Sequence, residues 1–75
     1  MINIAKIHNK LTEAIRQSGL TQKSLADKIG IKQQTVQQYV SGRIMPALDT
    51  FAKLCAVLDL DANDILCVSE YETEN

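Results

Sequence analysis

Apolar residues recur at three- and four-residue steps along most of the chain, the spacing that places them on one face of an α-helix. The first such series is Ile4, Ile7, Leu11, Ala14 and Ile15. It predicts a helix over residues 4–18, with Asn3 as its N-terminal cap and Gly19 as its end.

Two further apolar series are short and lie close together. They are Leu25, Ala26 and Ile29, and then Val36 with Tyr39 or Val40. The first predicts a helix that begins after the capping hydroxyl of Thr21 and ends at Gly30. The second predicts a helix over residues 33–40, which Ser41 and Gly42 stop. Two short helices joined by a tight turn with a glycine are typical of a helix-turn-helix.

The last two series complete an all-α chain. A fourth helix is marked by Leu48, Phe51, Leu54, Cys55 and Leu58. A short fifth helix is expected after the capping side chain of Asp61, with Asp59 in a left-handed conformation between the two helices. The pattern therefore predicts a compact five-helix bundle over residues 1–66, followed by an acidic tail over residues 67–75.

The second helix of the motif carries the clearest candidate chemistry. Its outward face is expected to show Gln33, Gln34, Gln37 and Gln38. A glutamine amide holds donors and an acceptor in one plane, which matches N6 and N7 of adenine in the major groove. This helix has no acidic side chain that would repel phosphate. Because glutamine is also a good helix former, a merely solvated polar face is the alternative.

Taken together, these residues resemble the helix-turn-helix of the Cro/repressor family, also called Xre-type regulators, which includes the phage lambda and 434 repressors. The residues that carry the resemblance are Thr21-Gln22, Leu25-Ala26, Gly30, Ile31, Val36, Tyr39 and Ser41-Gly42-Arg43, and it continues from Pro46 to Leu66. The resemblance implies a lambda-repressor-like bundle with a central helix-turn-helix that binds DNA.

The resemblance also implies a role for each side chain of the motif. Base contacts are implied for Gln33, Gln34, Gln37 and Gln38, with Gln37 the least supported of the four. Phosphate contacts are implied for Thr21, Gln22, Lys23, Lys32 and Arg43. Helix N-termini attract phosphate, which supports Gln22 on physical grounds. A simple helix-start residue is the alternative for Gln22.

Two positions depart from the family pattern. Lys32 stands where a serine or threonine usually caps the second motif helix, and Ala47 stands where a serine caps the next helix. A missing cap costs a helix start about 1 kcal/mol. Lys32 in return places a positive charge where a phosphate could lie.

The net charge of −1 conceals an uneven distribution. Residues 1–48 hold seven basic and two acidic residues, a net charge of +5, whereas residues 49–75 hold one basic and seven acidic residues, a net charge of −6. A basic half and an acidic half predict one face that approaches phosphate and one that avoids it. The alternative is an ordinary helical surface with an acidic tail.

The other reactive side chains form no recognisable site. Cys55 is expected in the core and Cys67 at the surface, both as reduced thiols. His8 is expected at the surface or edge of the first helix, without a metal or catalytic partner. The aspartates around the fifth helix lack the spacing of a calcium loop. We therefore expect no metal, no cofactor and no enzymatic activity.

The leading hypothesis is a sequence-specific, double-stranded DNA-binding transcriptional regulator, a repressor, that acts on an operator as a homodimer. The alternative is an antitoxin-like module that binds a toxin or another protein partner, as well as its own operator. Ile44, Met45 and the acidic tail would then form the protein contact. The chain has neither a long apolar run nor a signal segment, so we expect no membrane association and a cytoplasmic protein.

Overall fold

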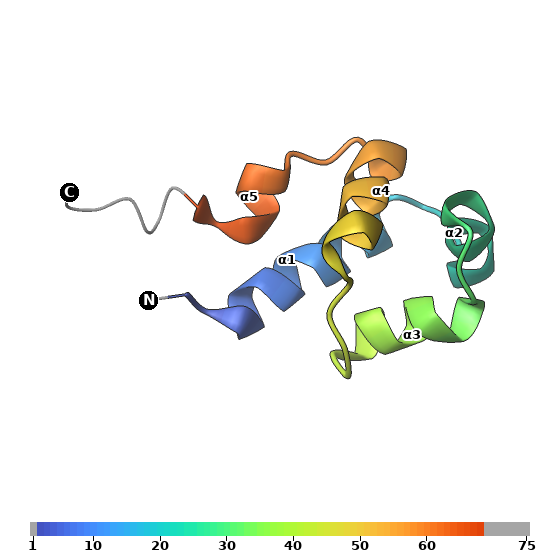
Figure 1. Cartoon of the computed structure of the whole chain (residues 1–75), viewed down its shortest axis with the longest axis horizontal. Helices are drawn as coiled ribbons and strands as arrows, with labels where there is room; N and C mark the ends of the chain where they lie inside the picture. Colours follow the sequence, from blue (N-terminus) through green and yellow to red (C-terminus); the bar gives the residue numbers. More distant parts are fainter. Residues whose placement is uncertain (1, 69–75) are drawn as a thin grey trace.

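A computed structural model of the protein describes residues 2–68, and these residues form five α-helices and no strand (Figure 1). The helices are α1 (Ile4–Gln17), α2 (Gln22–Ile29), α3 (Gln33–Ser41), α4 (Leu48–Leu58) and α5 (Ala62–Leu66). The predicted all-α, five-helix architecture is thereby confirmed. The first helix ends one residue earlier than predicted and the third ends one residue later. Residues 69–75 of the predicted tail lie outside the described residues.

Side-chain caps begin three of the helices, as the sequence predicts. They are Asn3, Thr21 and Asp61. In each case a side-chain oxygen accepts a hydrogen bond of 3.0 to 3.1 Å from a backbone N–H two or three residues further on. Lys32 and Ala47 begin α3 and α4 without any side-chain cap bond. The cap residues of these two helices therefore offer no side-chain acceptor to the first-turn amides, although in α4 the Thr50 amide donates to Asp49 Oδ1 at 2.9 Å.

One aliphatic cluster holds the helices together. Its members with less than 2% exposure are Leu11, Leu25, Val36 and Leu54, together with the small side chain of Ala26. Four helices therefore each contribute at least one fully buried residue, and α5 adds Ile65. Because each helix buries one stripe, this cluster fixes the rotation of each helix about its own axis.

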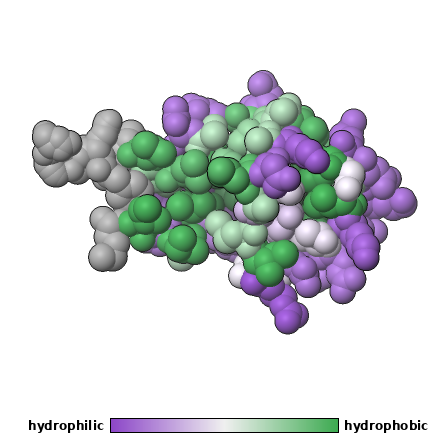
Figure 2. Space-filling model, in the orientation of Figure 1, coloured by the Kyte–Doolittle hydropathy of each residue, from purple (hydrophilic) through white to green (hydrophobic). Residues whose placement is uncertain are grey.

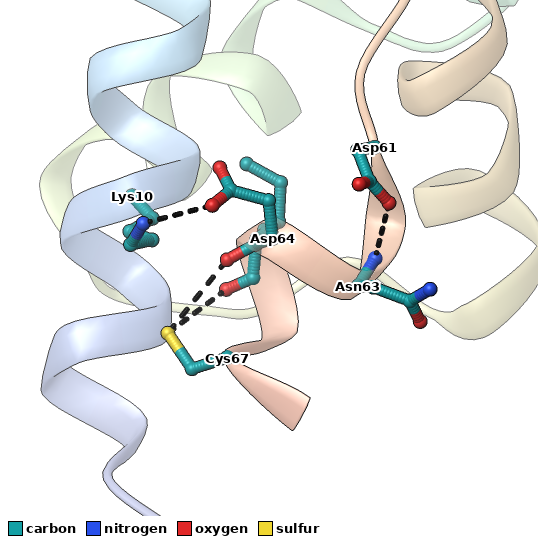
Figure 3. Close-up of polar contacts among 6 residues, drawn as sticks. Lys10, Asp61, Asn63, Asp64 and Cys67 are labelled. Atoms are coloured by element: carbon teal, nitrogen blue, oxygen red, sulfur yellow. Dashed lines mark hydrogen bonds and ion pairs between the residues drawn. The ribbon is translucent and has the colours of Figure 1, made fainter. Parts of the chain in front are cut away.

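The short helix α5 is held against α1 by one ion pair as well as by the core (Figure 3). Lys10 Nζ lies 3.2 Å from Asp64 Oδ1 and joins the two helices across the surface. Both side chains are partly exposed, so the pair contributes at most about 1 kcal/mol.

The two cysteines differ from their expected positions. Cys67 is buried, with 3% exposure, rather than at the surface. It ends α5 with a φ of 57°, and this left-handed turn returns its thiol to backbone carbonyl oxygens of α5, 3.7 Å away (Figure 3). Cys55 is half-buried. Burial, and then the negative charge of Asp61, raises the pKa of the Cys55 thiol above its usual value, which keeps it protonated at neutral pH.

Within residues 2–68, no helix has the length and apolar character needed to cross a membrane.

The uncapped start of α4 generates a stability prediction. Ala47→Ser should stabilise the fold by about 1 kcal/mol, because the new hydroxyl can accept a hydrogen bond from a first-turn amide of α4. Thermal unfolding should then show a midpoint raised by roughly 4–8 °C. Ala52→Ser, the same change at an exposed position inside α4, is the matched control and should not stabilise. Equal midpoints for the two variants would argue against the capping explanation.

Candidate nucleic-acid interface

The third helix is anchored by two side chains, and this anchoring determines which residues it exposes. Val36 is fully buried and Tyr39 is 4% exposed, both inside the aliphatic cluster. Gln33, Gln34 and Gln37 are exposed, as predicted from the apolar spacing. The exposed surface of α3 is therefore a row of amides, each with donors and an acceptor available to a ligand.

Gln38 differs from the other three glutamines because it is only half-exposed. The loop after α3 turns back over this end of the helix. The backbone amides of Arg43 and Ile44 donate to the Gln38 carbonyl oxygen at 3.0 and 3.5 Å, and the Ser41 hydroxyl donates to it at 3.2 Å. Helical periodicity alone predicts an outward side chain here, whereas the structure leaves the Gln38 side chain only half-exposed.

A tight turn joins α2 to α3 and fixes the orientation of one helix relative to the other. Gly30 ends α2 with a φ of 78°, a conformation that glycine adopts without strain. The amides of Gly30 and Ile31 both donate to the Ala26 carbonyl oxygen, at 2.8 and 3.0 Å. Ile31 then packs against the aliphatic cluster. The two helices and this turn confirm the predicted helix-turn-helix.

Basic side chains flank α3 at both ends. Lys32 precedes the helix and Arg43 follows it, and both are exposed. Neither belongs to an ion pair within residues 2–68, and neither does Lys28 on α2. Lys23 lies 3.4 Å from Asp27, but both side chains are about 70% exposed, and such pairs are weak and easily exchanged. Positive charge is therefore available to an anion around the motif.

The start of α2 brings together the remaining predicted phosphate ligands. Thr21 is exposed, and its oxygen accepts a hydrogen bond from the Ser24 amide at 3.0 Å. Its hydroxyl proton is still available as a donor. Gln22 is the first residue of α2 and is half-exposed. The first turn of α2 has no acidic residue, so the positive end of the helix dipole is not neutralised there.

His8 has a contact that the sequence did not indicate. Its Nε2 lies 2.9 Å from the Tyr39 carbonyl oxygen and 3.2 Å from the Thr12 hydroxyl, so the ring is half-buried between α1 and the end of α3. The ring also covers Gly42, where an added Cβ would lie 3.0 Å from His8 Cε1. A donor from α1 thus satisfies a carbonyl group in the last turn of α3.

The described residues contain no group of three or more histidine, cysteine or acidic side chains that could hold a metal ion.

Comparison with known proteins agrees with this geometry. A family model described as helix-turn-helix matches residues 11–65, which runs from α1 into α5 and includes the whole motif. No curated protein matches the chain.

The contact between His8 and Gly42 can be tested by a double-mutant cycle. His8→Ala should destabilise the fold by about 1 kcal/mol, because the Tyr39 carbonyl loses the imidazole donor and keeps only the Gly42 amide, at 3.3 Å. Gly42→Ala should cost about 1–2 kcal/mol, since residue 42 has a φ of 84° and its new methyl group meets the ring. Unfolding in urea measures both free energies.

In the His8→Ala background, Gly42→Ala should cost less than in the wild type, because the ring is absent and only the backbone strain remains. Equal costs in the two backgrounds would show that the ring contact does not constrain residue 42.

Proposed function

The chain belongs to the Xre-type helix-turn-helix family of DNA-binding regulators, and from this premise we propose that it is a sequence-specific repressor that reads the major groove of duplex DNA with α3. The observation that carries the proposal is the anchored helix α3, whose exposed amides lie between Lys32 and Arg43, two cations that belong to no ion pair within residues 2–68.

The width of the major groove admits one α-helix, and the N-terminal half of such a helix usually meets the base edges. Gln33 and Gln34 begin α3, and Gln37 lies one turn further on. A glutamine amide can donate to N7 or accept from N6 of adenine, and both bonds together discriminate against the other bases. Gln38, which is only half-exposed, contributes less to base contacts than the other three.

Phosphate contacts would fix the position of α3 in the groove. Arg43 and Lys32 are exposed at the two ends of α3 and can each neutralise a phosphate. Thr21, Gln22 and Lys23 surround the first turn of α2, whose amides and dipole favour an anion. Contacts from both helices of the motif would hold the duplex on two sides of the groove.

A single domain of this size covers few base pairs, so we propose that two copies bind as a twofold dimer. The two α3 helices would then enter successive major grooves about one helical turn apart. Occupation of such an operator would block access to the duplex, which is the simplest route to repression.

An antitoxin-like role is the second candidate. It draws support from the loop after α3, where Ile44 and Met45 are 40% and 39% exposed. Residues 69–75 of the acidic tail, which would join them in a protein contact, lie outside the described residues. This role does not explain the exposed amides of α3, so we place it second.

Substitution of Gln33 tests the proposed base readout. Gln33→Ala should weaken binding to the preferred duplex by about 1–3 kcal/mol and relax the preference at one base pair, while non-specific binding stays unchanged. Selection from random duplexes, followed by titration, measures both effects. Gln17→Ala, an exposed glutamine on α1, is the matched control. An unchanged base preference in Gln33→Ala would contradict the assigned role.

Substitution of Arg43 tests the proposed phosphate contact. Arg43→Ala should weaken binding to all duplex sequences by a similar factor and reduce the slope of log K against log salt by about 1. Lys53→Ala removes an exposed cation from α4 and should leave the slope unchanged. A sequence-dependent loss in Arg43→Ala would instead indicate a base contact.

A further inference from the structure

His8 joins α1 to the end of α3 through a hydrogen bond, and no step of the proposed DNA binding uses it. Its Nε2 lies 2.9 Å from the carbonyl oxygen of Tyr39, 31 residues further along the chain. A carbonyl oxygen can only accept, so Nε2 carries the proton and donates it. The bond therefore ties α1 to the last turn of α3 (Figure 1).

Thr12 helps to hold the ring of His8 in the position from which it donates. The two residues are four positions apart on α1, which places them on one face of the helix. Thr12 is buried, and its hydroxyl oxygen lies 3.2 Å from the same Nε2. Two oxygens from two helices thus meet one N–H group, so the orientation of the half-buried ring is fixed from both sides.

The ring also limits the path of the backbone where α3 ends. It covers Gly42 so closely that an added Cβ there would lie 3.0 Å from His8 Cε1. Gly42 has a φ of 84°, and its amide donates at 3.3 Å to the Tyr39 carbonyl oxygen, the acceptor that it shares with His8. Arg43 is the next residue, so the position of its backbone follows from that of Gly42.

The loop that carries Arg43 is held by hydrogen bonds more than by burial. Residues 41–45 are all exposed. Figure 2 shows hydrophilic side chains gathered at the end of the molecule that carries α2 and the start of α3. The Arg43 amide donates to the Gln38 carbonyl oxygen at 3.0 Å, a bond between α3 and its own loop. His8 adds a support from a different helix.

We propose that His8 is a positioning residue for DNA binding, which acts by holding the end of α3 so that Arg43 points toward a phosphate of the duplex. The proposal deepens the proposed function and rests on the phosphate contact of Arg43. An arginine on an unrestrained loop would lose conformational freedom when it binds a phosphate, and this loss weakens affinity. A loop that His8 already holds avoids part of the loss.

A purely structural role for His8 would have a different consequence. Loss of the side chain would then lower the free energy of unfolding, but the affinity of the folded chain for DNA would stay the same. The order of the loop and the DNA affinity of the folded variants therefore decide between the two roles.

Amide hydrogen exchange of the chain without DNA tests whether His8 orders the loop. In His8→Ala the Arg43 amide should exchange roughly three- to tenfold faster, because the loop opens more often without the donor. Ile15→Val, which removes one buried methyl group from the same helix, is the matched control for a loss of core stability. It should leave the exchange of the Arg43 amide unchanged. The same exchange rate in His8→Ala as in the wild type would refute the proposal.

Titration with duplex DNA, where circular dichroism shows each variant to be folded, tests the effect on binding. His8→Ala should weaken binding to preferred and unrelated duplexes by one common factor of roughly three to ten. It should also lower the slope of log K against log salt, since a phosphate contact is weakened. Ile15→Val should match the wild type in both affinity and slope.

The variant His8→Gln tests whether the donated hydrogen bond is the cause. The amide nitrogen of glutamine lies as many bonds from Cβ as Nε2 of histidine does, so a donor stays within reach of the Tyr39 carbonyl. This variant should restore DNA affinity to within about twofold of the wild type. An affinity no better than that of His8→Ala would contradict the assigned role.

A double-mutant cycle tests whether His8 acts through Arg43. In the Arg43→Ala background, His8→Ala should change DNA affinity by less than about twofold, because the phosphate contact is already lost. Equal losses in the two backgrounds would overturn the proposal.

Failure of this proposal and failure of the proposed function give different results. A wild type that binds all duplex sequences equally would overturn sequence-specific reading by α3, while the salt slope would still report the effect of His8 on the phosphate contact. A wild type that reads a preferred duplex, with a His8→Ala variant that binds equally well, would overturn only the role of His8. A chain that binds no duplex would overturn both.

Discussion

The burial of Val36 and Tyr39 is the constraint on which the rest of the interface depends. Both side chains lie within the aliphatic cluster, so α3 cannot rotate about its axis without bringing them into water. Burial of a valine alone is worth about 1.5–3 kcal/mol, and the same rotation would bury a polar amide without a partner. The two costs add, so the amides of Gln33, Gln34 and Gln37 are held outward by the core and not by any contact of their own.

Both ends of α3 are restrained as well as its rotation. At the start, the turn after α2 is closed by two amides on one carbonyl, and Ile31 anchors it in the core. At the end, His8 donates to the Tyr39 carbonyl and covers Gly42, so the loop that carries Arg43 begins from a fixed point. If α3 is already ordered before it binds DNA, it loses less conformational entropy on binding than a flexible segment would, which favours affinity.

Local sequence patterns predict much of this fold because the contacts that fix its helix boundaries join residues that are close in the sequence. Asn3, Thr21 and Asp61 cap helices through residues two or three positions away, and apolar spacing identifies each buried stripe. The contacts that escaped prediction are long-range. His8 meets a carbonyl 31 residues away, and Lys10 pairs with a carboxylate 54 residues away. Such contacts depend on how the helices cross, which periodicity does not encode.

The described residues of the basic half of the chain include both paired and unpaired cations once the molecule is folded. On α1, Lys10 and Arg16 lie beside carboxylates, whereas Lys28, Lys32 and Arg43 belong to no ion pair within the described residues. Three of the cations without an ion pair in this part of the chain thus lie on and around the helix-turn-helix, and Lys53, on α4, is a further one outside it. Because salt screens exposed charges, DNA binding through the cations around the motif should weaken steeply as ionic strength rises.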